Sequence, residues 1–223
     1  MSEPGPPQSS IRDGVRAGMP FAFASFALSV SFGVVAQPLI GTWPTIVVSV
    51  IVFAGAAQAA SLSVLAAGGA VPAAVIAGLL VNARFLPMGF ASGPAFRGRK
   101  LKRAVDGQAI VDASWAVSSR GDGTFDRGLL IGGTIPQYIA WQLGTIIGVF
   151  GGSLLSHPDR LGLDAIFPAF YLALLFHEIR RGEALGVALA AVAITLVLLP
   201  VAPAGVPVVV ASLTALWGLR RGW

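Results

Sequence analysis

The chain has 223 residues, of which 55% are hydrophobic and 11% are charged, with a formal net charge of +5. Soluble domains carry about 25% charged residues, and so few charges do not cover the surface of a soluble domain of this size. Residues 17–83 contain no Asp, Glu, Lys or Arg. At about 1.5 Å per residue this run is long enough for roughly three bilayer crossings. The composition predicts a polytopic membrane protein and excludes soluble enzymes, DNA-binding proteins and disulfide-rich secreted domains.

The chain offers few side chains for metal or thiol chemistry. It contains no cysteine, and its two histidines, His157 and His177, are too few for a His-rich metal site. We therefore predict no metal and no cofactor. In a chain this apolar, the net positive charge indicates basic cytoplasmic loops rather than a nucleic-acid partner.

The hydropathy pattern predicts an all-α helical bundle. We expect a disordered tail at residues 1–10, because MSEPGPPQSS is small, polar and Pro-rich. Residues 11–223 are expected to form a single transmembrane transporter domain. Pro38 and Gly41 should end the first crossing, and Gly68-Gly69 the second. The seven predicted crossings lie at about 17–37, 44–67, 72–93, 128–152, 163–178, 183–199 and 203–219.

The stretch 101–118 is consistent with an eighth crossing or with a short interfacial or re-entrant helix. It contains Asp106, Gln108 and Asp112, which makes it too polar for exposure to lipid. If it does not cross and the C-terminus is cytoplasmic, 11 Lys and Arg lie inside and 3 outside, whereas a crossing gives 8 and 6. The positive-inside rule therefore favours seven crossings and an external N-terminus.

Arg84 is the one charge within the first three predicted crossings. A cation at that depth costs at least a few kcal/mol and needs a partner or a hydrated cavity. One interpretation is that Arg84 binds an anionic group of a substrate, such as a carboxylate. The other is a structural Arg paired with an internal Asp or with backbone carbonyls.

Asp112 lies among apolar neighbours in Ile110–Trp115. Burial would raise the pKa of such a carboxyl and allow it to exchange protons. From the local sequence we slightly favour the alternative, a helix-capping or helix-surface carboxylate near the membrane face.

The string Phe53–Gln58 (FAGAAQ) places small residues and one amide inside the second predicted crossing. Gly55 weakens the helical preference there, and transporters use such breaks to present N–H groups to a substrate carboxylate. Close helix packing through the small residues is the more common explanation. Gln58 is equally suited to a hydrogen bond with a neighbouring helix.

Gly144, Gly148 and Gly152 lie on one face of the fourth predicted crossing, at a spacing of four residues. They predict a packing seam, against a helix of this chain or against a partner subunit. The same segment carries a polar stripe, for which we favour hydrogen bonds between helices over a cavity lining. The stripe consists of Gln137, Tyr138, Trp141 and Gln142.

Motifs of hydrolases are missing from the sequence. His177-Glu178 is followed by Ile-Arg-Arg rather than by the second histidine of a zinc protease, and no Gly-x-Ser-x-Gly elbow or phosphate-binding loop is present. The sequence therefore does not favour an intramembrane enzyme.

The chain resembles the AzlC family, the large subunit of bacterial branched-chain amino acid exporters, from about Asp13 to Trp217. The stretches that carry the resemblance are Phe53–Gln58, Leu65–Gly68, Asn82-Ala83-Arg84 with Met88-Gly89, Asp112, Trp141–Gly148 and Phe167–Phe170. Many members have Asp-Glu where this chain has Asp112-Ala113. If that pair couples transport to protons, half of it is absent here.

The resemblance implies an exporter in the bacterial cytoplasmic membrane that works with a small hydrophobic subunit of the AzlD type. The implied substrates are leucine, isoleucine and valine, with methionine as a further candidate. Arg84 or the N–H groups near Gly55 would bind the carboxylate, and Asp112 would couple protons or bind the ammonium. The remaining expected substrate-binding residues are Asn82 and Gln58 for the ammonium and Phe53 and Phe85 for the side chain. A non-transporting membrane scaffold is the alternative, which the glycine seam would serve.

Overall fold

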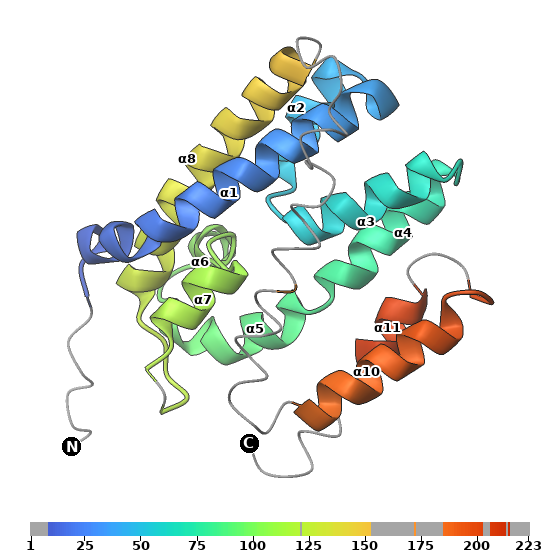
Figure 1. Ribbon diagram of the computed structural model, residues 1–223. Coiled ribbons are helices and arrows are strands. Elements are labelled where there is room, and N and C mark those ends of the chain that lie inside the picture. The colour runs from blue at the N-terminus through green and yellow to red at the C-terminus, as the bar shows by residue number, and fades with distance from the viewer. Residues whose placement is uncertain are drawn as a thin grey trace.

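The structure is a computed structural model that describes residues 9–120, 122–152, 172, 185–202, 206–212 and 214. Within this part the chain is helical and contains no strand, only one bridge between Ser119 and Phe125. The elements (Figure 1) are α1 (Ile11–Ile40), α2 (Thr42–Ile51), α3 (Gly55–Ala66), α4 (Val71–Asn82), α5 (Phe85–Ser92), the short 3-10 helix η1 (Gly93–Ala95), α6 (Lys100–Gly107), α7 (Asp112–Ser118), α8 (Arg127–Gly151), α10 (Leu185–Leu198) and α11 (Val206–Ser212).

Two predicted crossings fall largely or wholly on residues that are not described. Apart from Leu172, the crossing at 163–178 lies outside the described residues, together with His177, Glu178 and Phe167–Phe170. Residues 203–219 are described only at 206–212 and 214. The crossing predicted at 183–199 contains α10.

Helix α1 begins before the uncharged run of residues 17–83 and continues past residue 37, the predicted end of the first crossing. Ser10 caps it, because its hydroxyl accepts from the N–H of Asp13 while the carboxylate of Asp13 accepts from the N–H of Ser10. Pro38 lies inside the helix, so the prediction that it ends the crossing is wrong. The helix ends at Gly41, whose φ of 87° is a conformation that glycine adopts without strain.

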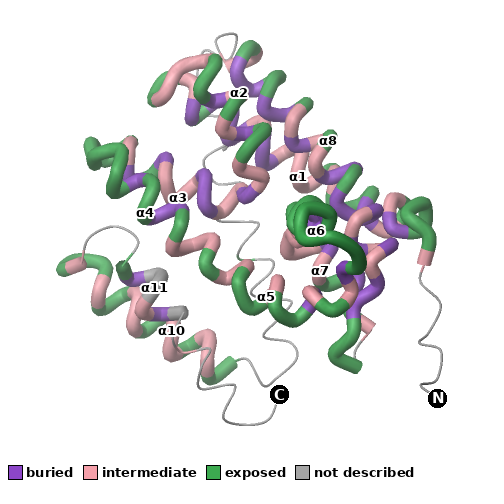
Figure 2. Tube along the Cα trace, turned by 180° about the vertical axis from the view of Figure 1, so that it is seen from behind, coloured by how far each residue is buried: buried purple, intermediate pink, exposed green. Residues whose placement is uncertain are grey.

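Helices α1 and α8 lie side by side and run parallel (Figure 1). Gly14 of α1 lies against Gly132 near the start of α8, and Gly33 lies against Gly148 near its end. A Cβ on Gly148 would collide with the carbonyl oxygen of Val30, so this part of the seam needs glycine. Figure 2 shows buried residues along both helices, whereas α6 is almost wholly exposed.

The glycine ridge of α8 therefore faces α1 of the same chain. A Cβ on Gly144 would meet the hydroxyl of Ser29 and the carbonyl of Phe26 in α1. At Gly152 a Cβ would make only ordinary contact with Val34, at 3.5 Å. The need for glycine thus fades toward the C-terminal end of the ridge.

The second predicted crossing does not run straight from 44 to 67, because the chain folds back at residues 52–54. Helix α2 runs antiparallel to α8, with Ser49 Oγ 2.8 Å from Thr145 Oγ1 and the Tyr138 hydroxyl donating to the Val50 carbonyl at 3.1 Å. Helix α3 then turns back along α1, where Leu62 packs into the core with Phe32. At about 1.5 Å per residue, α2 and α3 are each about half as long as a bilayer core is thick. They form a re-entrant pair.

The third predicted crossing exists as α4 and α5, with an interruption at Ala83 and Arg84. The N–H of Leu86 reaches the carbonyl of Ala83 at 3.1 Å, an i to i−3 bond, and Pro87 has no N–H to continue the regular pattern. A proline also clashes with the carbonyl four residues before it, here that of Ala83. The sequence therefore places a tight turn where Arg84 lies.

The stretch 101–118 forms two short helices, α6 and α7, instead of the single helix that we predicted. Eight and seven residues are too few to cross a bilayer. The connection between them is inserted beside α8, because the carbonyl of Ala109 accepts from Thr134 Oγ1. From Asp112, α7 returns to the start of α8, where the N–H of Asp126 donates to the carbonyl of Ser118 at 2.8 Å. The two helices are too short for the predicted eighth crossing, and the interfacial or re-entrant alternative stays a prediction.

The N-terminal segment and the basic stretch 97–127 lie at the same end of the molecule. The N–H of Ser9 donates to Oδ2 of Asp126 at 2.8 Å, and Arg120 donates to the same oxygen at 2.7 Å. Burial alone would raise the pKa of Asp126, but the hydrogen bonds from Ser9, Arg120 and Leu129 outweigh it and hold the pKa well below its usual value. Because Ser9 bonds to Asp126, the N-terminal segment lies beside stretch 97–127, and the prediction of an N-terminus on the opposite side is wrong.

Two described segments are long and apolar enough to cross a membrane by length and composition, Ile11–Ile40 and Val71–Ala95. Helix α8 has 25 residues and matches the fourth predicted crossing within one residue at each end. The total of seven crossings stays a prediction.

Candidate functional site

A pocket of about 80 Å³ lies where the interrupted helices and the tip of α7 meet. The α2–α3 break and the α4–α5 turn form one side of it, α7 another, and α1 and α8 complete it. Irregular backbone at membrane depth is tolerated where it is enclosed by protein or lines a cavity. The lining residues are Ser25, Leu28, Phe53, Ala54, Gly55, Ala56, Arg84, Phe85, Val111, Asp112, Ala113, Gln137 and Trp141.

The pocket contains one cation and one anion, and they form an ion pair. Nη2 of Arg84 lies 2.8 Å from Oδ2 of Asp112. Their side chains are 35% and 44% exposed, so the pair remains accessible from the pocket. Arg84 thus has the internal Asp partner that the structural interpretation expects. The pair also lines a cavity, which is what the functional interpretation expects. Asp112 is the first residue of α7, but Val111 is the N-cap and no described side chain caps this helix, so the capping role suggested for Asp112 is not seen.

Two donors of the lining have no hydrogen-bond partner among the described residues. They are Nε of Arg84 and the indole Nε1 of Trp141, and both atoms are buried. Unpaired buried donors are uncommon because each costs about 1–3 kcal/mol. The two donors favour a ligand that brings acceptor atoms, such as a carboxylate.

The N-terminus of α3 opens onto the same pocket through Ala54, Gly55 and Ala56. The first N–H groups of any helix lack partners within it, and the helix dipole adds a partial positive charge there. In α3 the first backbone hydrogen bond of the helix runs from the N–H of Gln58 to the carbonyl of Ala54, at 3.0 Å. This end of α3 therefore adds to the positive potential supplied by Arg84.

Aromatic side chains enclose the pocket. The guanidinium carbon of Arg84 lies 5.0 Å from the ring centroid of Phe85, within the range of a cation–π interaction. The ring of Phe53 meets that of Trp141 edge-on, at 5.9 Å between centroids. Both phenylalanines expected at the substrate's side chain thus line the pocket.

Two predicted substrate-binding residues do not line it. The amide of the buried Gln58 donates to the carbonyl of Val52 in the α2–α3 break and to that of Val48 in α2, each of which also accepts from a backbone N–H. Asn82 ends α4, and its Oδ1 is buried without a partner in the described part of the chain. Gln58 therefore has a structural task, and the contact of Asn82 with a substrate stays a prediction.

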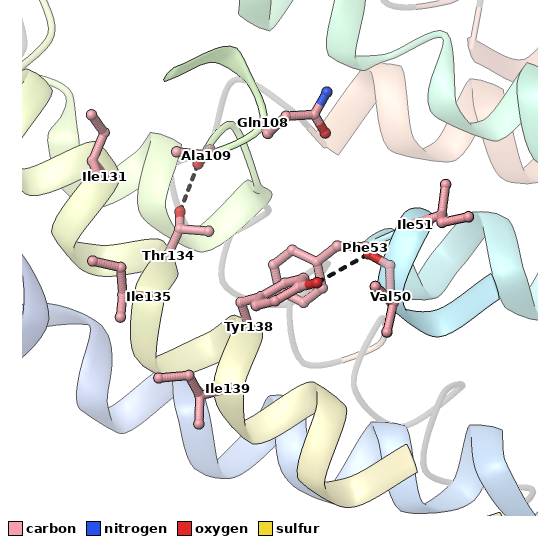
Figure 3. Close-up of a pocket in the computed structure, with 10 residues that line it drawn as sticks. All are labelled: Val50, Ile51, Phe53, Gln108, Ala109, Ile131, Thr134, Ile135, Tyr138 and Ile139. Atoms are coloured by element: carbon pink, nitrogen blue, oxygen red, sulfur yellow. Dashed lines mark hydrogen bonds between the residues drawn. The ribbon is translucent and has the colours of Figure 1, made fainter. Parts of the chain in front are cut away.

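A second, mostly apolar pocket of about 370 Å³ shares Phe53 with the first. Figure 3 shows Ile131, Ile135 and Ile139 following one face of α8 toward the end of α2, with Tyr138 bonded to Val50. Phe53 lines both pockets. The break that exposes the N-terminus of α3 thus also supplies an aromatic ring that lines both pockets.

Sequence reasoning missed Trp141 and Gln137 as pocket residues. Both belong to the polar stripe of α8, for which we favoured hydrogen bonds between helices. The stripe divides: Gln142 donates to the carbonyl of Ser49 at 3.1 Å, as expected, whereas Trp141 and Gln137 line the cavity. The signal was present in the sequence, but helix periodicity alone does not show which neighbour each residue meets.

In the described residues no group of three or more His, Cys, Asp or Glu gathers to hold a metal ion.

Comparisons with known proteins find similarity to membrane proteins. The family profile described as AzlC protein matches residues 20–155, more than half of the chain. An Escherichia coli K12 protein named inner membrane protein YgaZ is 27% identical over 219 residues, covering 90% of this chain and 87% of its own length. An uncharacterized membrane protein of Helicobacter pylori is 24% identical over 136 residues, covering 60% of this chain and 59% of its own length. No solved structure matches. The chain belongs to the AzlC family of membrane proteins.

Proposed function

We propose that this protein is the large subunit of a secondary transporter that exports branched-chain amino acids across the bacterial cytoplasmic membrane. Membership of the AzlC family and the relative named as an inner membrane protein support a role in membrane transport. The substrates proposed are leucine, isoleucine and valine, with methionine as a further candidate. The proposed location is a multi-pass one in the inner membrane.

One observation carries the proposal: two interrupted helical segments present a helix N-terminus and a cation to one pocket, and α7 presents an anion to it. Secondary transporters bind substrates where discontinuous helices meet, with half-helix N-termini facing anionic groups. A branched-chain amino acid is a zwitterion with an apolar side chain. It therefore needs a donor set, an acceptor and apolar contacts within a few ångströms, and this pocket supplies all three.

The roles follow from the charges. Arg84 and the N-terminus of α3 at Gly55 bind the carboxylate, because a guanidinium and free N–H groups both donate to it. Asp112 accepts from the ammonium. Phe53 and Phe85 contact the aliphatic side chain. The pocket has room for roughly five water-sized spheres, which is enough for the charged head of an amino acid. The side chain would then extend toward Phe53.

The test is transport of leucine, valine and methionine by the purified protein in proteoliposomes, with and without an AzlD-type small subunit. We expect Arg84→Ala to abolish leucine flux while the protein still inserts and remains monodisperse. Normal flux by a well-folded Arg84→Ala protein would remove Arg84 from the mechanism. Absence of any amino-acid flux with the small subunit present would favour the scaffold alternative, although the glycine seam gives that alternative no support, because it is used within the chain.

Asp112 is also the residue proposed to couple transport to protons. Ala113, which stands where many family members have Glu, lines the pocket beside Asp112. A second carboxyl at that position would therefore lie within the site. Flux measured with and without an imposed pH gradient shows whether Asp112 alone suffices. Equal leucine flux under both conditions would remove proton coupling.

A further inference from the structure

The bond between Arg84 and Asp112 is a single contact between two separate elements. Arg84 lies in the turn between α4 and α5, and Asp112 begins α7, 28 residues later. One guanidinium nitrogen, Nη2, makes the contact, while Nε of the same group is buried without a partner among the described residues. Strong Arg–carboxylate pairs use two parallel bonds. This pair uses only part of the donor capacity of Arg84.

The pocket is electrically balanced when only protein lines it. Apart from Arg84 and Asp112, no residue of its described lining is ionisable. Within a membrane protein, two opposite charges that neutralise each other are less costly than either charge alone. A ligand that separates them must therefore supply a new partner to each.

An α-amino acid meets this requirement, because its carboxylate and its ammonium lie in one molecule. Its carboxylate would accept hydrogen bonds from Arg84, including the free Nε, and from the N–H of Trp141. Its ammonium would donate to Asp112. Each charge of the protein keeps a partner throughout. A ligand with a single charge that opened the pair would leave either Arg84 or Asp112 unpaired.

We propose that the substrate opens the Arg84–Asp112 ion pair and inserts between its two members, and that the pair closes again when the substrate leaves. The proposal rests on the proposed function and specifies its chemistry: the site selects zwitterions by exchange of an internal ion pair. The substrate then links the α4–α5 turn to α7 in place of the direct bond. The empty carrier carries no unpaired charge at the site.

The test compares three ligands of similar shape on the purified full-length protein. Leucine carries both charges, leucinamide at pH 6 carries only the ammonium, and 4-methylpentanoate carries only the carboxylate. We expect both single-charge ligands to bind at least about tenfold more weakly than leucine, because each leaves one charge of the pair unpaired.

Single substitutions should redirect the charge preference. Asp112→Asn leaves Arg84 alone, so 4-methylpentanoate should bind at least as well as leucine and much better than leucinamide. Arg84→Gln leaves Asp112 alone, so leucinamide should become the preferred ligand. The double variant Arg84→Gln/Asp112→Asn retains neither charge and should distinguish the three ligands little. The matched control is Asp106→Asn, which removes the carboxylate of the Asp106–Arg127 pair outside the pocket and should keep the wild-type preference for leucine.

The outcomes separate this proposal from the proposed function. If the wild type binds and transports leucine but leucinamide or 4-methylpentanoate binds equally well, ion-pair exchange is wrong and the transport function stands. The same conclusion follows if folded Asp112→Asn and Arg84→Gln proteins both keep the wild-type order. If the wild type binds none of the three ligands and transports no leucine, the proposed function itself is wrong.

Discussion

The backbone N–H of Ser9 donates to the carboxylate of Asp126 at 2.8 Å, across 117 residues of sequence. The bond ties the start of α1 to the start of α8 and joins the N-terminal segment to the basic stretch 97–127. Because that stretch carries seven Lys and Arg, the positive-inside rule places this end of the molecule in the cytoplasm.

Topology is the first prediction. We expect a tag at the N-terminus and a cysteine introduced as Asp122→Cys to lie on the same, cytoplasmic side. The chain has no native cysteine, so the single thiol can be labelled without background. A membrane-impermeant maleimide should label it in inside-out vesicles and leave it unlabelled in intact cells.

Each alternative labelling result has a distinct meaning. If the tag and the cysteine lie on opposite sides, the Ser9–Asp126 contact is wrong. If both are external, the contact stands and the charge rule fails for this protein.

Asp126 should stabilise the fold in a pH-dependent way. Its folded pKa lies below its usual value of about 3.9, so its contribution is complete above about pH 4 and is lost as the pH falls toward the folded pKa. We expect Asp126→Asn to lower the free energy of unfolding by about 1.5–3 kcal/mol at pH 7, since it weakens hydrogen bonds to a buried charge. Denaturation of both proteins from pH 7 to pH 3 should show their difference shrinking below pH 4.

The matched control is Asp122→Asn, which changes an exposed carboxyl of the same loop and should alter stability little at pH 7. A difference between wild type and Asp126→Asn that stays constant down to pH 3 would contradict the proposed origin of the effect.

The α1–α8 seam should not tolerate a single added methyl group at Gly148. Its Cβ would overlap the carbonyl oxygen of Val30, and backbone cannot move aside as a flexible side chain can. We expect Gly148→Ala to destabilise the protein by about 1–3 kcal/mol. Gly151→Ala is the control on the same helix, because nothing lies within 4 Å of its Cβ. Thermal unfolding in detergent would measure both, and equal midpoints would show that the seam is not close-packed.

Pro87 should maintain the interruption that presents Arg84. Pro87→Ala restores an N–H that can reach the Ala83 carbonyl, so we expect a gain of about 0.5–1.5 kcal/mol in stability together with a loss of leucine flux. The control is Pro72→Ala in the first turn of α4, where proline is tolerated and Arg84 is not affected. Wild-type flux in a stabilised Pro87→Ala protein would show that the turn is not required.

The candidate site could be predicted in part because unusual residues in an apolar chain are conspicuous. Arg84 interrupts a long uncharged stretch, and Gly55 lies in a run of small residues, so both drew attention without any structure. Phe53, Phe85 and Asp112 were also named, and all five line one pocket. The sequence favours a hydrogen bond between helices for Trp141 and substrate binding for Gln58, because amphipathic position does not identify the partner of a polar group. The indole of Trp141 and the amide of Gln58 meet quite different neighbours.

Hydropathy and composition by themselves determined that this is a helical membrane protein, where α1, α4–α5 and α8 lie, and which few charges lie within apolar segments. These properties depend on transfer of residues from water to lipid, which is local along the chain. Only the tertiary structure decided that α2 and α3 fold back, that α1 and α8 run parallel, and that Arg84 meets Asp112. An apolar segment is equally soluble in lipid whether it crosses or returns, so contacts such as Ser49 with Thr145 and Gln58 with Val52 select the returning path. The bond between Ser9 and Asp126 likewise brings the N-terminal segment to the same end as stretch 97–127, which no count of charges shows.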